Sequence, residues 1–283
     1  MMKFSIVTIC FNAAEEIKTT MESVLAQDFD DFEYIIEDGM SEDATEDIVK
    51  GYAEKFAARG IKFVYNRQPD KGIYDAMNKG VASATGDYVN FMNAGDCFYS
   101  VGVLTEVAQA MDKSEDIPDI VYGDCVVYEY GRFYMFRKAP DKIEETMPFS
   151  HQSVFAKTQL LRDHPFDIGY RYSADYDFLL TAHDIGAKFL DSGTVVCIAT
   201  ADGTSSINYH DTLMESAGIL KAHGVLKQSP EELAKTERTL RLKQFVLDHF
   251  PVSVKRRIRN RQIISRGQDF TAVVPPWFER TTH

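Results

Sequence analysis

Alternating strand and helix patterns through the first hundred residues constrain the fold most. Short apolar runs typical of buried strands lie at residues 4–10, 32–36, 61–65 and 87–92. Between them, apolar residues recur at helical spacing. The first helix is expected to open at Asn12, with Ile17 and Met21 on its apolar stripe, and another is expected from about Ile73 to Gly86. This order predicts an α/β fold: a mostly parallel sheet with helices on both faces.

The remainder of the chain is expected to be less regular. A helix is expected at 101–111 and strands at 120–130, 132–136 and 194–199. The first two of these strands predict antiparallel additions to the sheet. Strand patterns end near Ser206, and Ser229-Pro230 with Glu232 forms a helix start. We therefore expect a first domain over residues 1–206 and a helical, basic, amphipathic C-terminal extension over 207–283.

Composition narrows the class of protein. The 283 residues are 45% apolar and 26% charged, as in globular proteins, and the net charge is −12. An acidic chain matches nucleic acid poorly, so no nucleic-acid partner is expected. The four cysteines show no CxxC spacing, which indicates reduced, buried thiols. With no signal-peptide pattern and no membrane-spanning apolar run, we expect a cytoplasmic protein whose membrane contact, if any, is peripheral.

Polar residues at strand ends are the first candidates for a site, because α/β sheets bind ligands beyond the carboxyl ends of their strands. Residues 91–96 deliver Asp96 into a small-residue turn, where a carboxylate suits a divalent cation. The alternative is a turn-forming aspartate. Asp38 ends the second strand and suits a base or ribose, whereas Ser41 and an Asp43–Glu46 capping box are expected to begin the next helix.

Two further segments carry candidate chemistry. Residues 70–80 contain Gly72, which permits close backbone approach, and Lys71, which suits phosphate; the alternative is a polar loop. Residues 172–178 contain Asp175 and Asp177, which could raise each other's pKa and supply a general base; the alternative is an acidic helix start.

Residues 148–153 place polar side chains in an apolar setting. His151 there is either a site residue or a structural histidine. A glycine turn at 202–206 is a weaker candidate.

These segments, in this order, resemble the family 2 glycosyltransferases, which are inverting enzymes with the GT-A fold. Residues 5–12 look like that family's first strand, and residues 27–29 look like the end of its first helix. The segment 70–80 and the turn 93–96 are similar to a bacterial colanic-acid or capsule biosynthesis subgroup. The resemblance covers residues 4–206.

The resemblance implies roles for individual residues. Asp96 would hold Mn²⁺ or Mg²⁺ against the diphosphate, and Asp175 would be the catalytic base. The implied donor-binding residues are Thr8, Asn12, Asp38, Asp70, Lys71, Gly72, Asn78, Asn93 and Asp96. The implied acceptor-side residues are His151, Gln152 and Asp177. Asn93 and Ala174 depart from the acids usual at their positions.

The implied reaction transfers a sugar, from a UDP-sugar in preference to GDP or dTDP donors, to a glycan or lipid-linked acceptor in cell-surface polysaccharide biosynthesis. Basic residues interleaved with apolar ones after residue 235 suit an anionic membrane face; the alternative is a helical subdomain that packs on the core or forms a homodimer. Two other readings stay open: a catalytically degenerate partner subunit and a nucleotidyltransferase. No GxGxxG follows the first strand, which disfavours a Rossmann dehydrogenase.

Overall fold

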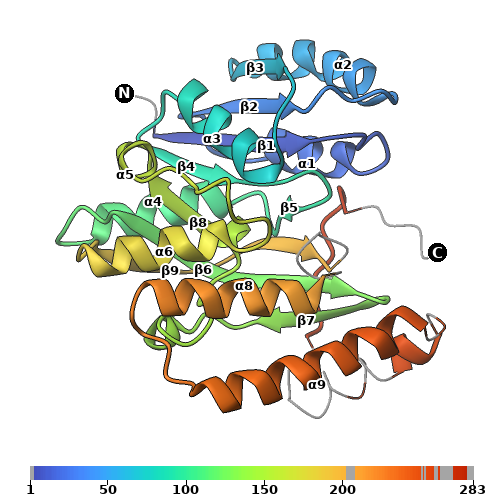
Figure 1. Cartoon of the computed structure of the whole chain (residues 1–283). Helices are drawn as coiled ribbons and strands as arrows, with labels where there is room; N and C mark the ends of the chain where they lie inside the picture. The colour runs from blue at the N-terminus through green and yellow to red at the C-terminus, as the bar shows by residue number, and fades with distance from the viewer. Residues whose placement is uncertain are drawn as a thin grey trace.

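A mixed sheet of nine strands runs through the centre of the computed structural model (Figure 1). The structure describes residues 3–201, 208–249, 251, 253–257, 261 and 270–278. The predicted turn at 202–206, the domain boundary after residue 206, and Arg259 of the basic tail lie outside these ranges.

The strands follow the order β3-β2-β1-β4-β8-β6-β9-β5, with β7 paired to β6. Their bounds are β1 (Phe4–Cys10), β2 (Phe32–Asp38), β3 (Lys62–Arg67), β4 (Tyr88–Phe91), β5 (Cys97–Phe98), β6 (Ile120–Glu129), β7 (Arg132–Phe136), β8 (Val154–Lys157) and β9 (Phe189–Thr200). The strands β1 to β4 are mutually parallel, and β8 runs antiparallel to both β4 and β6. β9 runs parallel to β6, with β5 antiparallel at the edge.

The strand register brings the candidate residues to one edge. Cys10 at the end of β1 lies opposite Asp38 of β2, which lies opposite Arg67 of β3. On the other side of β1, Val7 pairs with Phe91, so the turn at 93–96 leaves β4 at the same edge. Parallel strands therefore gather residues from distant parts of the sequence at their carboxyl ends, as expected.

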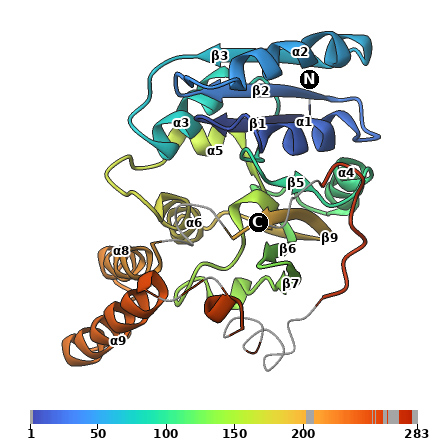
Figure 2. The same ribbon diagram turned by 90° about the vertical axis from the view of Figure 1, so that its right-hand side faces the viewer.

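Helices cover both faces of the sheet (Figure 2). On one face lie α1 (Ile17–Leu25), α2 (Thr45–Ala58) and α4 (Val103–Lys113). On the other lie α3 (Ile73–Ser83), α5 (Thr158–Asp163), α6 (Ala174–Asp184) and α8 (Tyr209–Ala222). Each layer buries its own apolar cluster against the sheet. The helix α9 (Pro230–His249) packs on α8, and two short 3₁₀ turns, η1 (Pro140–Lys142) and η2 (His151–Ser153), complete the elements.

The described C-terminal residues pack back onto the sheet. The Trp277 side chain joins Cys97, Val126 and Ile198 in a third apolar cluster, and its Nε1 donates to the carbonyl of Phe98 at 3.0 Å. β5 begins directly after Asp96, so this segment covers the strand that follows the candidate metal turn.

Most predicted elements are confirmed, including the parallel strands and the added antiparallel ones. The Ser229–Glu232 capping box is also present, with Glu232 Oε2 accepting from the Ser229 amide at 2.8 Å. The short elements β5, β8 and α5 were not predicted. All four cysteines are buried and free, as expected. Among the described residues, no helix has the length and apolar character needed to cross a membrane.

Two local predictions were wrong. The first helix begins at Ile17, not at Asn12, because Asn12 has a positive φ of 50° and lies in the turn after β1. The Asp43–Glu46 capping box does not form. The Glu46 carboxylate instead pairs with Lys50 at 2.6 Å and Arg67 at 3.3 Å, while Asp43 accepts from the Thr45 amide at 3.0 Å.

Candidate active site

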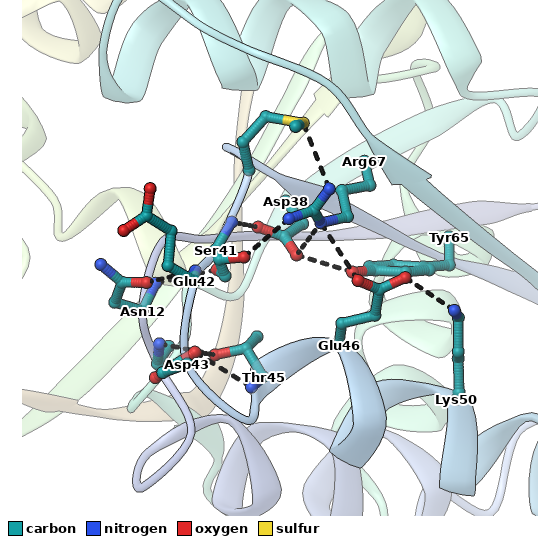
Figure 3. Close-up of polar contacts among 12 residues, drawn as sticks. Asn12, Asp38, Ser41, Glu42, Asp43, Thr45, Glu46, Lys50, Tyr65 and Arg67 are labelled. Carbon is teal, nitrogen blue, oxygen red and sulfur yellow. Dashed lines mark hydrogen bonds and ion pairs between the residues drawn. The ribbon is translucent and has the colours of Figure 1, made fainter.

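The Asp38 carboxylate ends β2 and is held by a compact polar cluster (Figure 3). Its Oδ1 accepts from the Ser41 amide at 2.8 Å, and its Oδ2 accepts from the Tyr65 hydroxyl at 2.6 Å. Arg67 Nε lies 3.9 Å from Oδ2. Burial and the contact with Asp38 raise the pKa of Tyr65, which therefore remains a neutral donor. Asp38 is only 1% exposed, so its position is fixed before any ligand arrives.

Asn12 fastens two loops together at this edge. Its amide donates to Ser41 Oγ at 2.9 Å, and its Oδ1 accepts from the Glu42 amide at 2.8 Å (Figure 3). Its left-handed backbone is one that asparagine adopts more readily than most residues. The predicted position at a strand end is correct, and the observed contacts give Asn12 a role in shaping the site.

Phe11 also lies at this edge of the sheet and was not among the residues predicted from the sequence. Its side chain is 63% exposed at the end of β1, beside Gly39. A Cβ added at Gly39 would lie 2.4 Å from Asp70 Oδ2, so only glycine lets the Asp70 carboxylate lie against this loop. Asp70 Oδ1 in turn accepts from the Gly72 amide at 2.9 Å. The sequence signal that could have identified Phe11 is an aromatic residue placed immediately after a buried apolar strand.

The segment leading into α3 is organised by Asp75. Its Oδ2 accepts from the Lys71 amide at 2.9 Å and pairs with Lys79 at 2.8 Å. The Lys71 side chain is exposed, and Gly72 has a φ of 120° that favours glycine. This arrangement keeps the predicted Lys71 and Gly72 at the open edge of the sheet.

The turn after β4 presents Asp96 from a nearly buried position. Its Oδ2 accepts from Gln152 Nε2 at 2.7 Å, and its Oδ1 accepts from the Thr200 amide at 3.0 Å. Thr20 of α1 supports the turn, because its hydroxyl donates to the Asp96 carbonyl at 2.7 Å and accepts from the Gly95 amide at 3.0 Å. Nothing in the sequence distinguished Thr20 from its helical neighbours.

Asp175 lies in the first turn of α6 and keeps 16% of its side chain exposed. Its Oδ2 is 3.2 Å from His151 Nδ1, and its Oδ1 accepts from the Tyr74 hydroxyl at 3.0 Å. Burial and the Asp175 charge raise the pKa of Tyr74, so Tyr74 donates as a neutral hydroxyl. His151 Nε2 lies 3.0 Å from Asn93 Nδ2.

The short turn η2 joins the two halves of the site. His151 contacts Asp175, while the next residue, Gln152, contacts Asp96. The sequence placed both residues in the site, but it gave no sign that two consecutive side chains would link the candidate metal ligand to the candidate base.

A small cavity lies beside this link. Apolar side chains from β4, β8 and α6 line most of it. His151 and Asp175 are the polar residues of its lining. Their contact is therefore bordered on one side by apolar core, where hydrogen bonds are stronger than in water.

Three predicted residues have structural roles instead. Thr8 is fully buried, and its hydroxyl is already engaged by the Met92 carbonyl at 2.7 Å and by the Tyr34 hydroxyl at 2.9 Å. Asn78 clasps the backbone of Phe166, donating to its carbonyl at 2.9 Å and accepting from its amide at 3.0 Å. The predicted donor contacts of Thr8 and Asn78 are thus corrected to packing and loop anchoring.

Asp177 is the third of these residues, because it turns away from Asp175. Its Oδ1 lies 3.1 Å from His223 Nε2 of α8, and His223 Nδ1 lies 2.6 Å from Asp184. Burial lowers the pKa of His223, but the hydrogen bonds to Asp184 and Asp177 outweigh it and raise that pKa. Asp175 and Asp177 therefore face different partners, since a two-residue step on a helix separates their faces.

The residues around Asp96 fit a hard cation only in part. The described residues contain no group of three or more histidine, cysteine or acidic side chains that could hold a metal ion. However, Asn93 Oδ1, in the turn that carries Asp96, is buried and has no hydrogen-bond partner among the residues that the structure describes. One carboxylate and one amide oxygen suit an ion that takes its other ligands from phosphate and water.

Comparison with known proteins places this geometry in a family. The profile of glycosyl transferase family 2 matches residues 5–179. A PGL/p-HBAD biosynthesis glycosyltransferase of Mycobacterium bovis is 32% identical over 180 residues, which are 62% of this chain and 67% of that protein. The amylovoran biosynthesis glycosyltransferase AmsB of Erwinia amylovora is 26% identical over 201 residues, which are 67% of this chain and 66% of that protein.

Solved structures share the fold at low identity. The mannosyltransferase PcManGT from Pyrobaculum calidifontis, solved with GDP-Man and Mn²⁺, has a TM-score of 0.61 at 16% identity, covering 93% of this chain and 80% of that one. Residues 1–349 of S. aureus TarS, solved with UDP, give 0.60 at 20% identity, covering 83% and 68%. The predicted GT-A fold is confirmed, whereas the colanic-acid or capsule subgroup stays a prediction. Since the family profile spans more than half of the sequence and includes both Asp96 and Asp175, the chain belongs to glycosyl transferase family 2.

Proposed function

We propose that this chain is an inverting glycosyltransferase. It moves a sugar from a nucleotide-diphosphate donor, with a UDP-sugar as first choice, to a glycan or lipid-linked acceptor in cell-surface polysaccharide biosynthesis. Family membership and the amylovoran relative support the reaction class and the pathway type. The observation that carries the proposal for this chain is η2, which ties Asp96 to Asp175 through consecutive residues.

The donor nucleotide would lie along the carboxyl edge of β1 and β2. The exposed Phe11 ring offers a face to a base, and stacking of a base on an aromatic ring contributes about 1–3 kcal/mol. Asp38, fixed by Ser41 and Tyr65, would meet the polar edge of the base or the ribose. The diphosphate would then extend toward the turn that carries Asp96.

A divalent cation held by Asp96 and Asn93 Oδ1 would neutralise negative charge on the leaving diphosphate. Gln152 and the Thr200 amide fix the Asp96 carboxylate in that position. Thr20 fixes the backbone of the same turn. The chain therefore supplies an oriented pair of oxygen donors and leaves the remaining positions to the donor substrate.

Asp175 would act as the general base. Its Oδ1 already accepts from Tyr74 and from the Tyr176 amide at 3.0 Å, whereas Oδ2 faces His151. Oδ2 therefore takes the proton of the acceptor hydroxyl. The acceptor oxygen bonds to the anomeric carbon as the carbon–oxygen bond to the diphosphate breaks on the opposite face, and this single displacement inverts the configuration.

Peripheral membrane contact is a further part of the proposal. α9 exposes Leu242 and Phe245, and Arg241 lies on the same helix. Clustered basic residues near an anionic leaflet contribute about 1 kcal/mol each. Replacing Arg256, Arg257, Arg259 and Arg261 with Gln should abolish sedimentation with vesicles containing phosphatidylserine. Unchanged sedimentation would leave packing on the core as the role of the tail.

The test of the proposed function is a melting-temperature screen with UDP, GDP, dTDP and CMP, each with and without Mn²⁺. A ligand that binds the folded state raises its stability by mass action. We expect a Mn²⁺-dependent shift for one nucleotide, and its loss in Asp96→Ala. The UDP-sugar or other donor selected this way should then turn over in wild type but not in Asp175→Asn. Binding without Asp175-dependent turnover would favour the degenerate-partner alternative.

A further inference from the structure

Four side chains from four different elements form one continuous line through the candidate site. Asn93 follows β4, His151 lies in η2, Asp175 begins α6 and Tyr74 begins α3. The three contacts between them measure 3.0, 3.2 and 3.0 Å, from Asn93 to His151, His151 to Asp175 and Asp175 to Tyr74. One end of this line lies in the Asp96 turn and its centre is the candidate base.

The chemistry of the amide determines which nitrogen of His151 carries a proton. Asn93 Nδ2 bears hydrogens and has no lone pair to offer, so the facing His151 Nε2 must accept. The proton of the neutral ring then lies on Nδ1, where it donates to Asp175 Oδ2. Asn93 thus selects the tautomer of His151 that can orient the carboxylate.

The other atom of the Asn93 amide, Oδ1, indicates a ligand-binding position. This oxygen is buried, and within the described part of the chain it has no hydrogen-bond partner, although most buried polar atoms have one. A positive group or hydroxyl on Oδ1 would polarise the amide and strengthen donation from Nδ2, since hydrogen bonds in a chain reinforce one another. Occupation of the donor side would therefore be felt at His151.

We propose that His151 is a positioning residue that links donor-site occupation to the orientation of Asp175. The Asn93 amide fixes the Nδ1–H tautomer of His151, and this N–H directs Asp175 Oδ2 toward the acceptor, while Tyr74 holds Oδ1 from the other side. This inference rests on the proposed function, because it takes Asp175 to be the base. It predicts that the donor must be bound before the base is fully ordered.

Substitutions of His151 test the positioning role. His151→Asn keeps an N–H near the Nδ1 position, His151→Gln places its amide near the Nε2 position, and His151→Ala removes both. With the nucleotide-sugar selected by the melting screen and water as acceptor, we expect His151→Asn to stay within about 10-fold of the wild-type kcat. His151→Ala and His151→Gln should lose about 10–100-fold, the range for residues that orient a functional group. Donor KM and the nucleotide-dependent melting shift should change less than about twofold, because positioning acts on the chemical step.

Two controls separate the possible failures. His183→Asn, at the far end of α6 beside Glu144, should behave as wild type. If Asp175→Asn remains active, the proposed function of Asp175 fails. If Asp175→Asn is inactive but His151→Ala turns over like wild type, or if Gln rescues and Asn does not, only the positioning role is overturned.

A readout independent of turnover examines the tautomer directly. Two-bond ¹H–¹⁵N spectra, with the His151 signal identified by its loss in His151→Asn, should show Nδ1 protonated and Nε2 bare. In Asn93→Asp, an acceptor oxygen replaces the donor amide, so the proton should appear on Nε2. A protonated Nε2 in the wild type, or an unchanged spectrum in Asn93→Asp, would overturn the proposal.

Discussion

Two carboxylates of the candidate site, Asp38 and Asp175, are held in opposite ways. The Asp38 side chain is fully buried, and both of its oxygens receive hydrogen bonds from the adjoining loop and the neighbouring strand. Asp175 keeps 16% of its side chain exposed, and its partners His151 and Tyr74 come from other elements. A carboxylate proposed to recognise a ligand can be fixed in advance, whereas one proposed to take a proton must keep part of its surface accessible to the substrate.

The largest expected effect separates activity from stability at Asp175. Asp175→Asn keeps the shape of the side chain but removes its capacity to take a proton, so kcat should fall about 10²–10⁴-fold. The melting temperature should change little, because the side chain stays partly exposed. Steady-state kinetics and thermal unfolding of the same preparation measure both quantities.

Asp177→Asn is the matched control, since it lies on the same helix turn but faces His223. It should retain kcat within about threefold, in keeping with a residue remote from the chemistry. Equal losses in both variants would contradict the distinction between the two faces of α6.

The second effect is on stability, at Asp38. Asp38→Ala leaves the Tyr65 hydroxyl and the Ser41 amide without their acceptor, and each such loss costs about 1–3 kcal/mol. Arg67 keeps its contacts with Glu46 and the Ser41 carbonyl, so we expect a total of about 2–3 kcal/mol. Urea unfolding measures it, with exposed Glu42→Ala expected to shift the free energy of unfolding by less than about 0.5 kcal/mol.

The smallest effect is a pH dependence at the other face of α6. Because Asp184 and Asp177 raise the pKa of His223 in the folded state, its charged form stabilises folding below the unfolded value near 6.5. That contribution is lost as pH rises through the higher folded pKa. The free energy of unfolding of the wild type should therefore exceed that of His223→Gln at pH 6, and this difference should be about 1 kcal/mol smaller at pH 9. A difference that does not vary with pH would rule out the charged contact.

Much of the fold could be predicted because β1 to β4 and their helices carry strong local patterns. The two strands that complete the sheet around the site could not. β5 has two residues and β8 has four, too few for a recognisable alternation. β8 is also inserted between β4 and β6, a pairing that depends on tertiary packing and not on its own sequence.

Candidate site residues could be named from the sequence where a carboxylate coincides with a strand end, as at Asp38 and Asp96, and the structure places both at the carboxyl edge of the sheet. Residues were missed or misassigned where a polar side chain serves the backbone. Asn78 is of a residue type common in ligand contacts, but both ends of its side-chain amide bind the backbone of Phe166. Thr20 cannot be told from other helix residues by its sequence, yet its hydroxyl makes hydrogen bonds that support the Asp96 turn. Only the three-dimensional partners distinguish the two cases.

The close approach of Gly39 and Asp70 limits which substitutions these two positions can accept during evolution. A Cβ at position 39 would lie 2.4 Å from Asp70 Oδ2, and the hydrogen bond from the Gly72 amide to Asp70 Oδ1 opposes movement of that carboxylate. The two positions are therefore expected to vary together, with a larger residue at 39 accompanied by a shorter side chain at 70. Such a pair would appear as epistasis, in which the larger residue at 39 is harmful alone and tolerated in the double variant.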